Sequence, residues 1–226
     1  MCRAGRPVFI SDPELKLPLV AFCDAVEACE REGTRCPFYL GKVPLQQELP
    51  EIAQAIDECK DASPGAVLGD CFGPLIPEGI FTYYGCGHNV SATHYDPHEN
   101  MMLCVCGTKR VWLYPPSDLH CLYPHRGDAT QLAVSRLAGD YGASNKVSRS
   151  VVPPFKTHAQ LSGELQATFP KLAHARPVEA VLHAGDALYL PMCWWHCVEG
   201  SHERNCILNW WFLPHPRKAQ LDEAGG

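Results

Sequence analysis

The chain has 226 residues, of which 46% are hydrophobic and 19% charged, so it can bury a sizeable core and is not a disordered protein. Its formal net charge of −6 argues against binding to DNA, although basic residues at 146, 149 and 156 leave a local cationic patch open. No apolar stretch approaches the ~20 residues that a membrane-spanning helix needs, so no membrane association is expected.

The cysteine content points to a reducing compartment. The 13 cysteines are an odd number, and no long apolar run follows Arg3 and Arg6 as it would in a signal peptide. Disulfides are therefore not expected, and we predict a cytoplasmic or nuclear protein. The spacings C-x-C at 104–106 and C-x3-C at 193–197 lack the paired C-x2-C pattern of structural zinc sites, which makes zinc a minor alternative.

The first 63 residues predict a helical flank. From 18 to 31 the apolar residues recur at helical spacing, with Pro18 suited to the first turn and Gly33 to the end of the helix. A short strand is expected at 36–40, followed by a second amphipathic helix at 50–60. Both helices are expected to cover a β core.

After Pro64 short apolar and aromatic runs alternate with glycine and proline. Six runs are predicted to be strands, at 81–84, 101–106, 111–114, 187–190, 194–198 and 206–212. Short strands separated by turn residues indicate an all-β sandwich or barrel. Residues 115–177 break this rhythm and predict an insertion with a short helix at 160–169, a place where substrate choice often resides. We expect one domain over 1–226, with its β core at about 64–213.

His94 and Asp96 are the first candidates for a functional site. Residues two apart in a strand point to the same side, so these two could hold one metal ion together. Such a pair also occurs by chance, but His196 lies in another predicted strand and would complete the set. Two histidines and one carboxylate form the facial triad that suits non-haem Fe(II) and leaves positions open for substrate and dioxygen.

The other histidines are expected to be surface or hydrogen-bonded residues. His98 is the closest rival to the three candidate ligands because it lies near Asp96. Pro97 disturbs the alternation that would aim His98 inward.

Two hairpins are predicted around this site. Gly107-Thr108 fits a two-residue loop, which would pair Cys106 with Lys109. In that register Lys109 is the only charge on a face that also carries residues 100, 102, 104, 111 and 113. Either this face is exposed to solvent, or Lys109 lies in the interior and an anion meets it.

The second hairpin uses residues 200–205 as its loop. Pairing Glu199 with Cys206 would place His196 opposite Asn209, on one face with Trp211. Asn209 could then hydrogen-bond a ligand of the metal, whereas Trp211 is equally compatible with core packing.

The segment HYDPHENMMLCVCGTKRVWLYPPSD at 94–118 resembles the central motif of the small JmjC-domain oxygenases. That family includes the asparaginyl hydroxylase of hypoxia-inducible factor and the tRNA wybutosine hydroxylase. GDALYLP at 185–191, WWH at 194–196 and NWWF at 209–212 resemble the closing half of the same domain. The resemblance spans about 36–213 and implies a double-stranded β-helix of the cupin or jelly-roll kind, with Fe(II), the cosubstrate 2-oxoglutarate and dioxygen.

The resemblance also implies roles for individual residues. Iron would be bound by His94, Asp96 and His196. Five further residues match family positions around 2-oxoglutarate: Lys109, Tyr39, Ser91, Asn100 and Asn209. Of these, the lysine would pair with the distal carboxylate of the cosubstrate, and the tyrosine and serine hydroxyls would meet the same group.

The resemblance implies a dioxygenase that hydroxylates a side chain of a protein substrate. A tRNA-base hydroxylase of the same family and a non-catalytic JmjC-like binding module are the alternatives, and demethylation is a less expected outcome. Some relatives dimerise through a C-terminal helical extension, whereas this chain ends soon after Phe212. A monomer or weak dimer is therefore expected.

Overall fold

The computed structural model describes residues 8–9, 16–34, 36–59, 68, 71–87, 89–124 and 148–213, and the structural statements below refer to these residues. The helices are α1 (Leu19–Glu32), α2 (Leu45–Glu48), α3 (Pro50–Glu58) and α6 (Gly163–Thr168), with 3-10 turns η1 (Pro116–Cys121), η2 (His158–Gln160) and η3 (Pro170–His174). The strands are β1 (Val8–Phe9), β2 (Tyr39–Pro44), β3 (Leu75–Cys86), β4 (Asn89–Val90), β5 (His94–Tyr95), β6 (Glu99–Cys106), β7 (Thr108–Tyr114), β8 (Ser148–Arg149), β9 (Val178–His183), β10 (Ala187–Leu190), β11 (Trp195–Gly200) and β12 (Arg204–Phe212).

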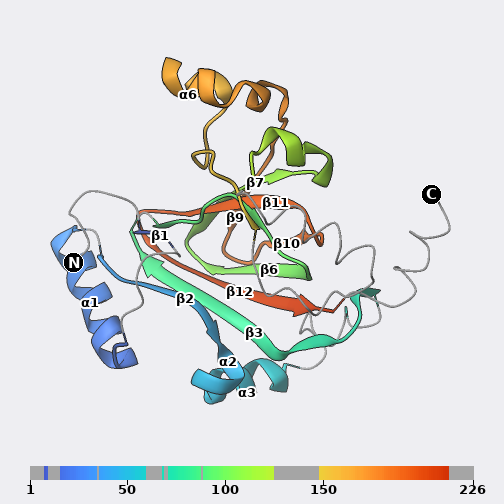
Figure 1. The fold of residues 1–226 in the computed structure, drawn as a ribbon. Coiled ribbons are helices and arrows are strands. Elements are labelled where there is room, and N and C mark those ends of the chain that lie inside the picture. The colour runs from blue at the N-terminus through green and yellow to red at the C-terminus, as the bar shows by residue number, and fades with distance from the viewer. Residues whose placement is uncertain are drawn as a thin grey trace.

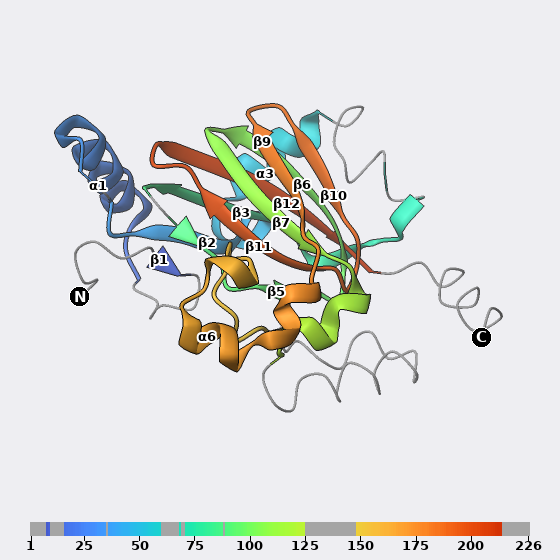
Figure 2. The same cartoon turned by 90° about the horizontal axis from the view of Figure 1, so that it is seen from above.

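The strands form two sheets that face each other (Figures 1 and 2). One sheet has five strands in the order β10-β6-β12-β3-β2. The other has seven, in the order β1-β4-β11-β5-β8, with β7 paired to β11 and β9 paired to β7. The main core lies between them, since buried residues of β3, β6 and β12 share one cluster with buried residues of β7 and β9. The predicted all-β core with flanking helices is confirmed.

The N-terminal helices cover the outer face of the five-stranded sheet. Phe22 of α1 packs edge-on against Tyr84 of β3, with ring centroids 5.6 Å apart. The helix ends where predicted, because Gly33 adopts the left-handed conformation at φ 63° and its N–H bonds back to the last turn. The α2–α3 pair packs on Ile80 and Trp210 of the same sheet (Figure 1). None of the helices in the described part of the chain is long and apolar enough to span a bilayer.

The first predicted strand begins later than expected. Residues 36–40 were predicted to be extended, but β2 runs from Tyr39 to Pro44. Pro37 explains the shift, because proline has no N–H to donate to a β ladder. The strand β9 (Val178–His183) was not predicted at all. Five of its six residues are exposed or half-exposed, so its sequence carries little of the apolar signal that marks a strand.

Both predicted hairpins are wrong. Strand β6 pairs with β10 and β12, whereas β7 pairs with β9 and β11 in the other sheet, so the Gly107 link crosses between sheets. Lys109 therefore pairs with Gly200 and Leu182 rather than with Cys106. A glycine-containing link fits a hairpin and a sheet-crossing corner equally well, and only the long-range pairing decides between them.

The second link behaves in the same way. Strand β11 lies in the seven-stranded sheet and β12 in the five-stranded sheet, so Glu199 does not pair with Cys206. His196 pairs instead with His94 and Leu113, and Asn209 with Phe81 and Met102. The predicted sharing of one face is therefore wrong, but His196, Asn209 and Trp211 still line the same pocket because inward-facing residues of two opposed sheets meet in the same interior.

The described part of the insertion, at 115–124 and 148–177, packs on the outer side of the seven-stranded sheet (Figure 1). It has a core of its own, in which Leu122, Phe169 and Leu172 join Trp112 and Trp195 of the sheet. The predicted helix is confirmed as the shorter α6, whose first turn is capped by Ser162. Strand β8 pairs with β5 and joins the insertion to the segment of His94. Residue 146 of the suggested cationic patch lies outside the described residues.

Gly107 permits the crossing between the sheets. Its φ is +72°, and a Cβ there would lie 2.2 Å from the carbonyl oxygen of Arg204. We expect Gly107→Ala to lower the free energy of unfolding by roughly 2–4 kcal/mol, since backbone strain and a backbone clash add. Urea denaturation measures this.

Two glycines of the same chain serve as controls. Gly163→Ala at the start of α6 meets no atom within 4 Å and is expected to be neutral or slightly stabilising. Gly185 has a φ of +93°, and a Cβ there would meet no atom within 4 Å. Gly185→Ala therefore measures the effect of backbone strain on stability without a clash. Equal stability of the Gly107 and Gly163 variants would contradict the tight packing of this link.

Candidate functional site

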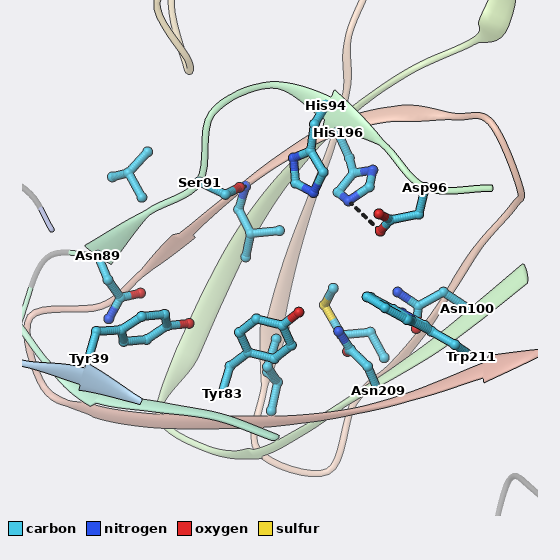
Figure 3. Close-up of a pocket in the computed structure, with 14 residues that line it drawn as sticks. Tyr39, Tyr83, Asn89, Ser91, His94, Asp96, Asn100, His196, Asn209 and Trp211 are labelled. Carbon is cyan, nitrogen blue, oxygen red and sulfur yellow. Dashed lines mark hydrogen bonds and ion pairs between the residues drawn. The ribbon is translucent and has the colours of Figure 1, made fainter. Parts of the chain in front are cut away.

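The space between the sheets contains a pocket of about 450 Å³, counting its open mouth. Its polar lining gathers at two ends (Figure 3). His94, Asp96 and His196 lie at one end, and Tyr39 and Asn89 lie at the other.

The two histidines are held by strand pairing and by backbone carbonyls. His94 of β5 is the direct partner of His196 in β11, and their ring centroids are 4.3 Å apart. Nδ1 of His94 lies 2.7 Å from the carbonyl oxygen of Ala92, and Nδ1 of His196 lies 3.1 Å from that of Trp194. A carbonyl can only accept, so each Nδ1 carries the proton and each Nε2 keeps its lone pair. Both rings are thus in the tautomer that a metal ligand needs.

Asp96 completes the group at this end. It follows β5 directly, and its Oδ2 is 3.6 Å from Nε2 of His196. One ligand atom from each of His94, Asp96 and His196 lies within 4.8 Å of the others. The carbonyl of Asp96 accepts a hydrogen bond from the N–H of Cys193 at 3.0 Å, which joins it to the turn before β11. The three side chains could therefore hold one metal ion.

The protonation state of His196 favours this use. Burial lowers the pKa of His196 to about 4, and neighbouring His94 acts in the same direction while Asp96 opposes it. The ring is therefore neutral at neutral pH, and its contact with Asp96 is not an ion pair. Neutral imidazole is the form that binds metals, so no proton has to be displaced from His196.

Lys109 lies behind Tyr39 and Asn89 at the other end and is fully buried, at 0% exposure. Its Nζ lies 3.3 Å from Oδ1 of Asn89 and 3.5 Å from the hydroxyl of Tyr39. No carboxylate of the described residues pairs with it, and burial lowers the pKa of Lys109 to about 8. The alternative of a solvent-exposed face is therefore wrong. A buried ammonium surrounded by neutral groups is suited to meeting an anion.

Two glycines make room for the partners of this ammonium. A Cβ at Gly85 would lie 2.6 Å from Cδ2 of Tyr39, and one at Gly200 would lie 2.3 Å from Oδ1 of Asn89. Burial raises the pKa of Tyr39, so its hydroxyl stays protonated and can donate.

The remaining predicted residues also line the pocket. Ser91 Oγ accepts the N–H of Val198 at 2.8 Å, which leaves its own proton free to donate. Asn100 and Asn209 are buried, and within the described chain their Oδ1 atoms have no hydrogen-bond partner. Buried polar atoms without partners are uncommon in native proteins, and a bound ligand would satisfy these two.

The structure thus brings all eight sequence-predicted residues to one pocket. Seven line it directly, and Lys109 lies behind the wall that Tyr39 and Asn89 form. His98 stacks on Trp211 and is not part of the metal-ligand group, as expected. No cysteine cluster suited to zinc occurs among the residues that the structure describes.

Sequence reasoning missed two residues of the pocket, Asn89 and Tyr83. Asn89 lies two residues before Ser91, and the alternation rule that linked His94 to Asp96 would have placed it on the same side. Tyr83 lies two residues after Phe81 in a predicted strand, but nothing in the sequence showed that this face of the strand lines the pocket.

The buried ammonium gives stability a defined pH dependence in the absence of ligand. The pKa of Lys109 falls from 10.5 to about 8 on folding, so between these values the unfolded chain binds more protons. The destabilising contribution of Lys109 is therefore largest below about pH 8 and is lost as the pH approaches 10.5. We expect Lys109→Met to be more stable than the wild type at neutral pH by up to about 3 kcal/mol, with the difference shrinking at alkaline pH.

Urea denaturation at several pH values tests this, with Lys171→Met as the control because Lys171 is exposed. The control should follow the wild type at every pH. A Lys109→Met protein that is less stable than the wild type at neutral pH, with no change in the difference at alkaline pH, would contradict the inference.

Comparison with known proteins supplies the family. A model of the cupin-like domain matches residues 8–218. The chain is 30% identical over 180 residues to Jumonji C domain-containing protein 5 of Drosophila melanogaster, covering 76% of this chain and 36% of that protein. It is 28% identical over 213 residues to the human bifunctional peptidase and (3S)-lysyl hydroxylase JMJD7, covering 90% of this chain and 61% of that protein.

A third relative is lysine-specific demethylase JMJ30 of Arabidopsis thaliana, 25% identical over 212 residues, with 92% of this chain and 41% of that protein covered. The chain thus spans less than two thirds of the length of each of these relatives. Because the family match runs through nearly all of the sequence and includes the pocket, the chain belongs to the cupin-like domain family, in its JmjC group.

Proposed function

We propose that this protein is an Fe(II)- and 2-oxoglutarate-dependent dioxygenase that hydroxylates a side chain of a protein substrate. The observation that carries the proposal is one pocket with a metal-binding triad at one end and the buried, carboxylate-free ammonium of Lys109 at the other. This arrangement suits a cosubstrate with a metal-chelating group and a distant anionic group, which 2-oxoglutarate has.

His94, Asp96 and His196 would hold the iron, and a facial triad leaves adjacent positions open for the keto acid and dioxygen. When bound, Fe(II) supplies the activation of dioxygen, which is coupled to oxidation of 2-oxoglutarate to succinate and carbon dioxide and to insertion of one oxygen atom into a substrate C–H bond. The chain itself holds the His196 imidazole neutral and turns both rings by hydrogen bonds to backbone carbonyls before the metal arrives.

The remaining polar residues would orient the cosubstrate. Lys109, with the hydroxyls of Tyr39 and Ser91, would receive the distal carboxylate, while the unpartnered amides of Asn100 and Asn209 lie toward the metal end. Apolar lining residues exclude water from the space between the two ends: Met102, Val198, Ile207 and Trp211. Water exclusion strengthens each of these electrostatic contacts.

A protein substrate is supported by the names of two relatives, a lysyl hydroxylase and a lysine-specific demethylase. Candidate proteins incubated with wild-type enzyme or with His94→Ala, and compared by mass spectrometry, should reveal products that gain the mass of one oxygen atom only with the wild type. Loss of a methyl group instead would show demethylation. Salt-dependent tRNA binding with tRNA oxidation would support the tRNA-base alternative.

Removal of a triad residue should abolish iron binding. In anaerobic titrations, His94→Ala and Asp96→Ala should lose Fe(II) binding, and neither should convert 2-oxoglutarate to succinate. His183→Ala, on the exposed end of β9, is the matched control and should behave like the wild type. Turnover that survives in the triad variants would refute the proposed metal site. Metal and cosubstrate binding by a wild type that shows no turnover would favour the binding-module alternative.

Substitution of Lys109 should weaken the binding of 2-oxoglutarate without affecting the binding of Fe(II). Lys109→Ala leaves the distal carboxylate without its charged partner, which costs ~2–4 kcal/mol of binding, or roughly 30- to 1000-fold in affinity. The apparent KM for 2-oxoglutarate should rise accordingly while Fe(II) binding persists. Lys109→Arg should rescue in part, because the charge remains but its geometry differs.

Lys171→Ala is the control for the loss of a lysine, and its KM should match that of the wild type. A Lys109→Ala enzyme with an unchanged KM would show that Lys109 is not the anchor.

A further inference from the structure

The phenol of Tyr83 is a polar side chain of the pocket to which the family resemblance gives no role. It reaches from β3 toward the middle of the pocket, between Tyr39 and the triad (Figure 3). Tyr83 is 8% exposed and lines the pocket. Figure 3 shows no hydrogen bond between its hydroxyl and the other residues drawn. A tyrosine that faces a pocket presents its hydroxyl to whatever binds there.

The inward direction of Tyr83 is fixed by the fold. Successive residues of a strand point to opposite faces, so Phe81 and Tyr83 face the space between the sheets while Tyr84 faces α1 and packs on Phe22. Tyr83 pairs with Ile207 in the centre of the five-stranded sheet. The ring therefore has little freedom to turn out of the pocket.

The two tyrosines of the pocket differ in what their hydroxyls contact. The Tyr39 hydroxyl already accepts a hydrogen bond from Lys109, at 3.5 Å. The Tyr83 ring lies 6.5 Å from that of Tyr39, measured between centroids. Burial is the largest cause that raises the pKa of Tyr83, followed by the charge of Asp96 and by Tyr39, so its hydroxyl stays protonated and can donate.

We infer that Tyr83 is a further cosubstrate-binding residue, whose O–H donates to the carboxylate that an α-keto acid places at the metal end of the pocket. This rests on the proposed function and extends it. A hydrogen bond from a neutral donor to a carboxylate in a dry site is among the stronger ones in proteins, and no charge needs to be added to the pocket to make it.

Ligand truncation separates the two ends of the pocket. Oxalate carries the metal-chelating carboxylates but lacks the distal group, so it tests the metal end alone. Isothermal titration under anaerobic conditions, with Mn(II) in place of Fe(II), measures the affinity of 2-oxoglutarate and of oxalate without turnover. The variants are Tyr83→Phe, Tyr84→Phe as the matched control that faces α1, and Lys109→Met as the distal reference.

Tyr83→Phe should weaken both ligands about 10-fold or more, the loss of one hydrogen bond to a charged acceptor. Lys109→Met should weaken 2-oxoglutarate far more than oxalate, and Tyr84→Phe should weaken neither. Phenylalanine keeps the ring that packs in the core, so Tyr83→Phe should melt like the wild type.

Three results would overturn the inference. Wild-type affinity of Tyr83→Phe for both ligands would show that the hydroxyl does not contact the cosubstrate. A loss confined to 2-oxoglutarate would place Tyr83 at the distal end instead. A wild-type protein that binds neither ligand with Mn(II) would reject the proposed function itself, and the inference with it.

Discussion

A single buried ammonium is the constraint on which the pocket is built. Lys109 has no carboxylate among its described neighbours, and its ammonium is hydrogen-bonded to the neutral side chains of Asn89 and Tyr39. Those two side chains fit because residues 85 and 200 are glycines. A Cβ at residue 85 would clash with Tyr39, and one at residue 200 would clash with Asn89. The protein accepts a destabilising charge at this point, which is typical of sites shaped for a ligand rather than for stability.

The other end of the pocket is organised by the main chain. Strand pairing places His94 beside His196, and local backbone carbonyls set both ring tautomers. The insertion contributes through β8, which pairs with β5, and the turn before β11 contributes through its bond to the carbonyl of Asp96. Main-chain hydrogen bonds therefore orient the metal ligands before a metal binds.

The metal end and the Lys109 end of the pocket meet only because the two sheets face each other. The two histidines and Lys109 lie on the seven-stranded sheet and Asp96 directly follows its strand β5, whereas Tyr39, Tyr83, Asn100 and Asn209 lie on the five-stranded sheet. The links at Gly107 and at 201–203 carry the chain from one sheet to the other, so the pocket forms when the core between the sheets closes. Stability of the core and geometry of the site are thus coupled.

The sequence by itself determined the residue types of the site and the short-range rules that orient them. Three features could be predicted because each depends on residues that are close in the sequence. They are the spacing of His94 and Asp96, the helical periodicity before Gly33, and the single charge of Lys109 in an apolar strand. Strand pairing joins residues that are far apart in the sequence, and no local pattern distinguishes a hairpin from a link between sheets. Tertiary structure alone decided that β6 and β7 lie in different sheets, that Lys109 is enclosed, and that Asn89 and Tyr83 join the pocket, because burial and long-range pairing are properties of the packed chain.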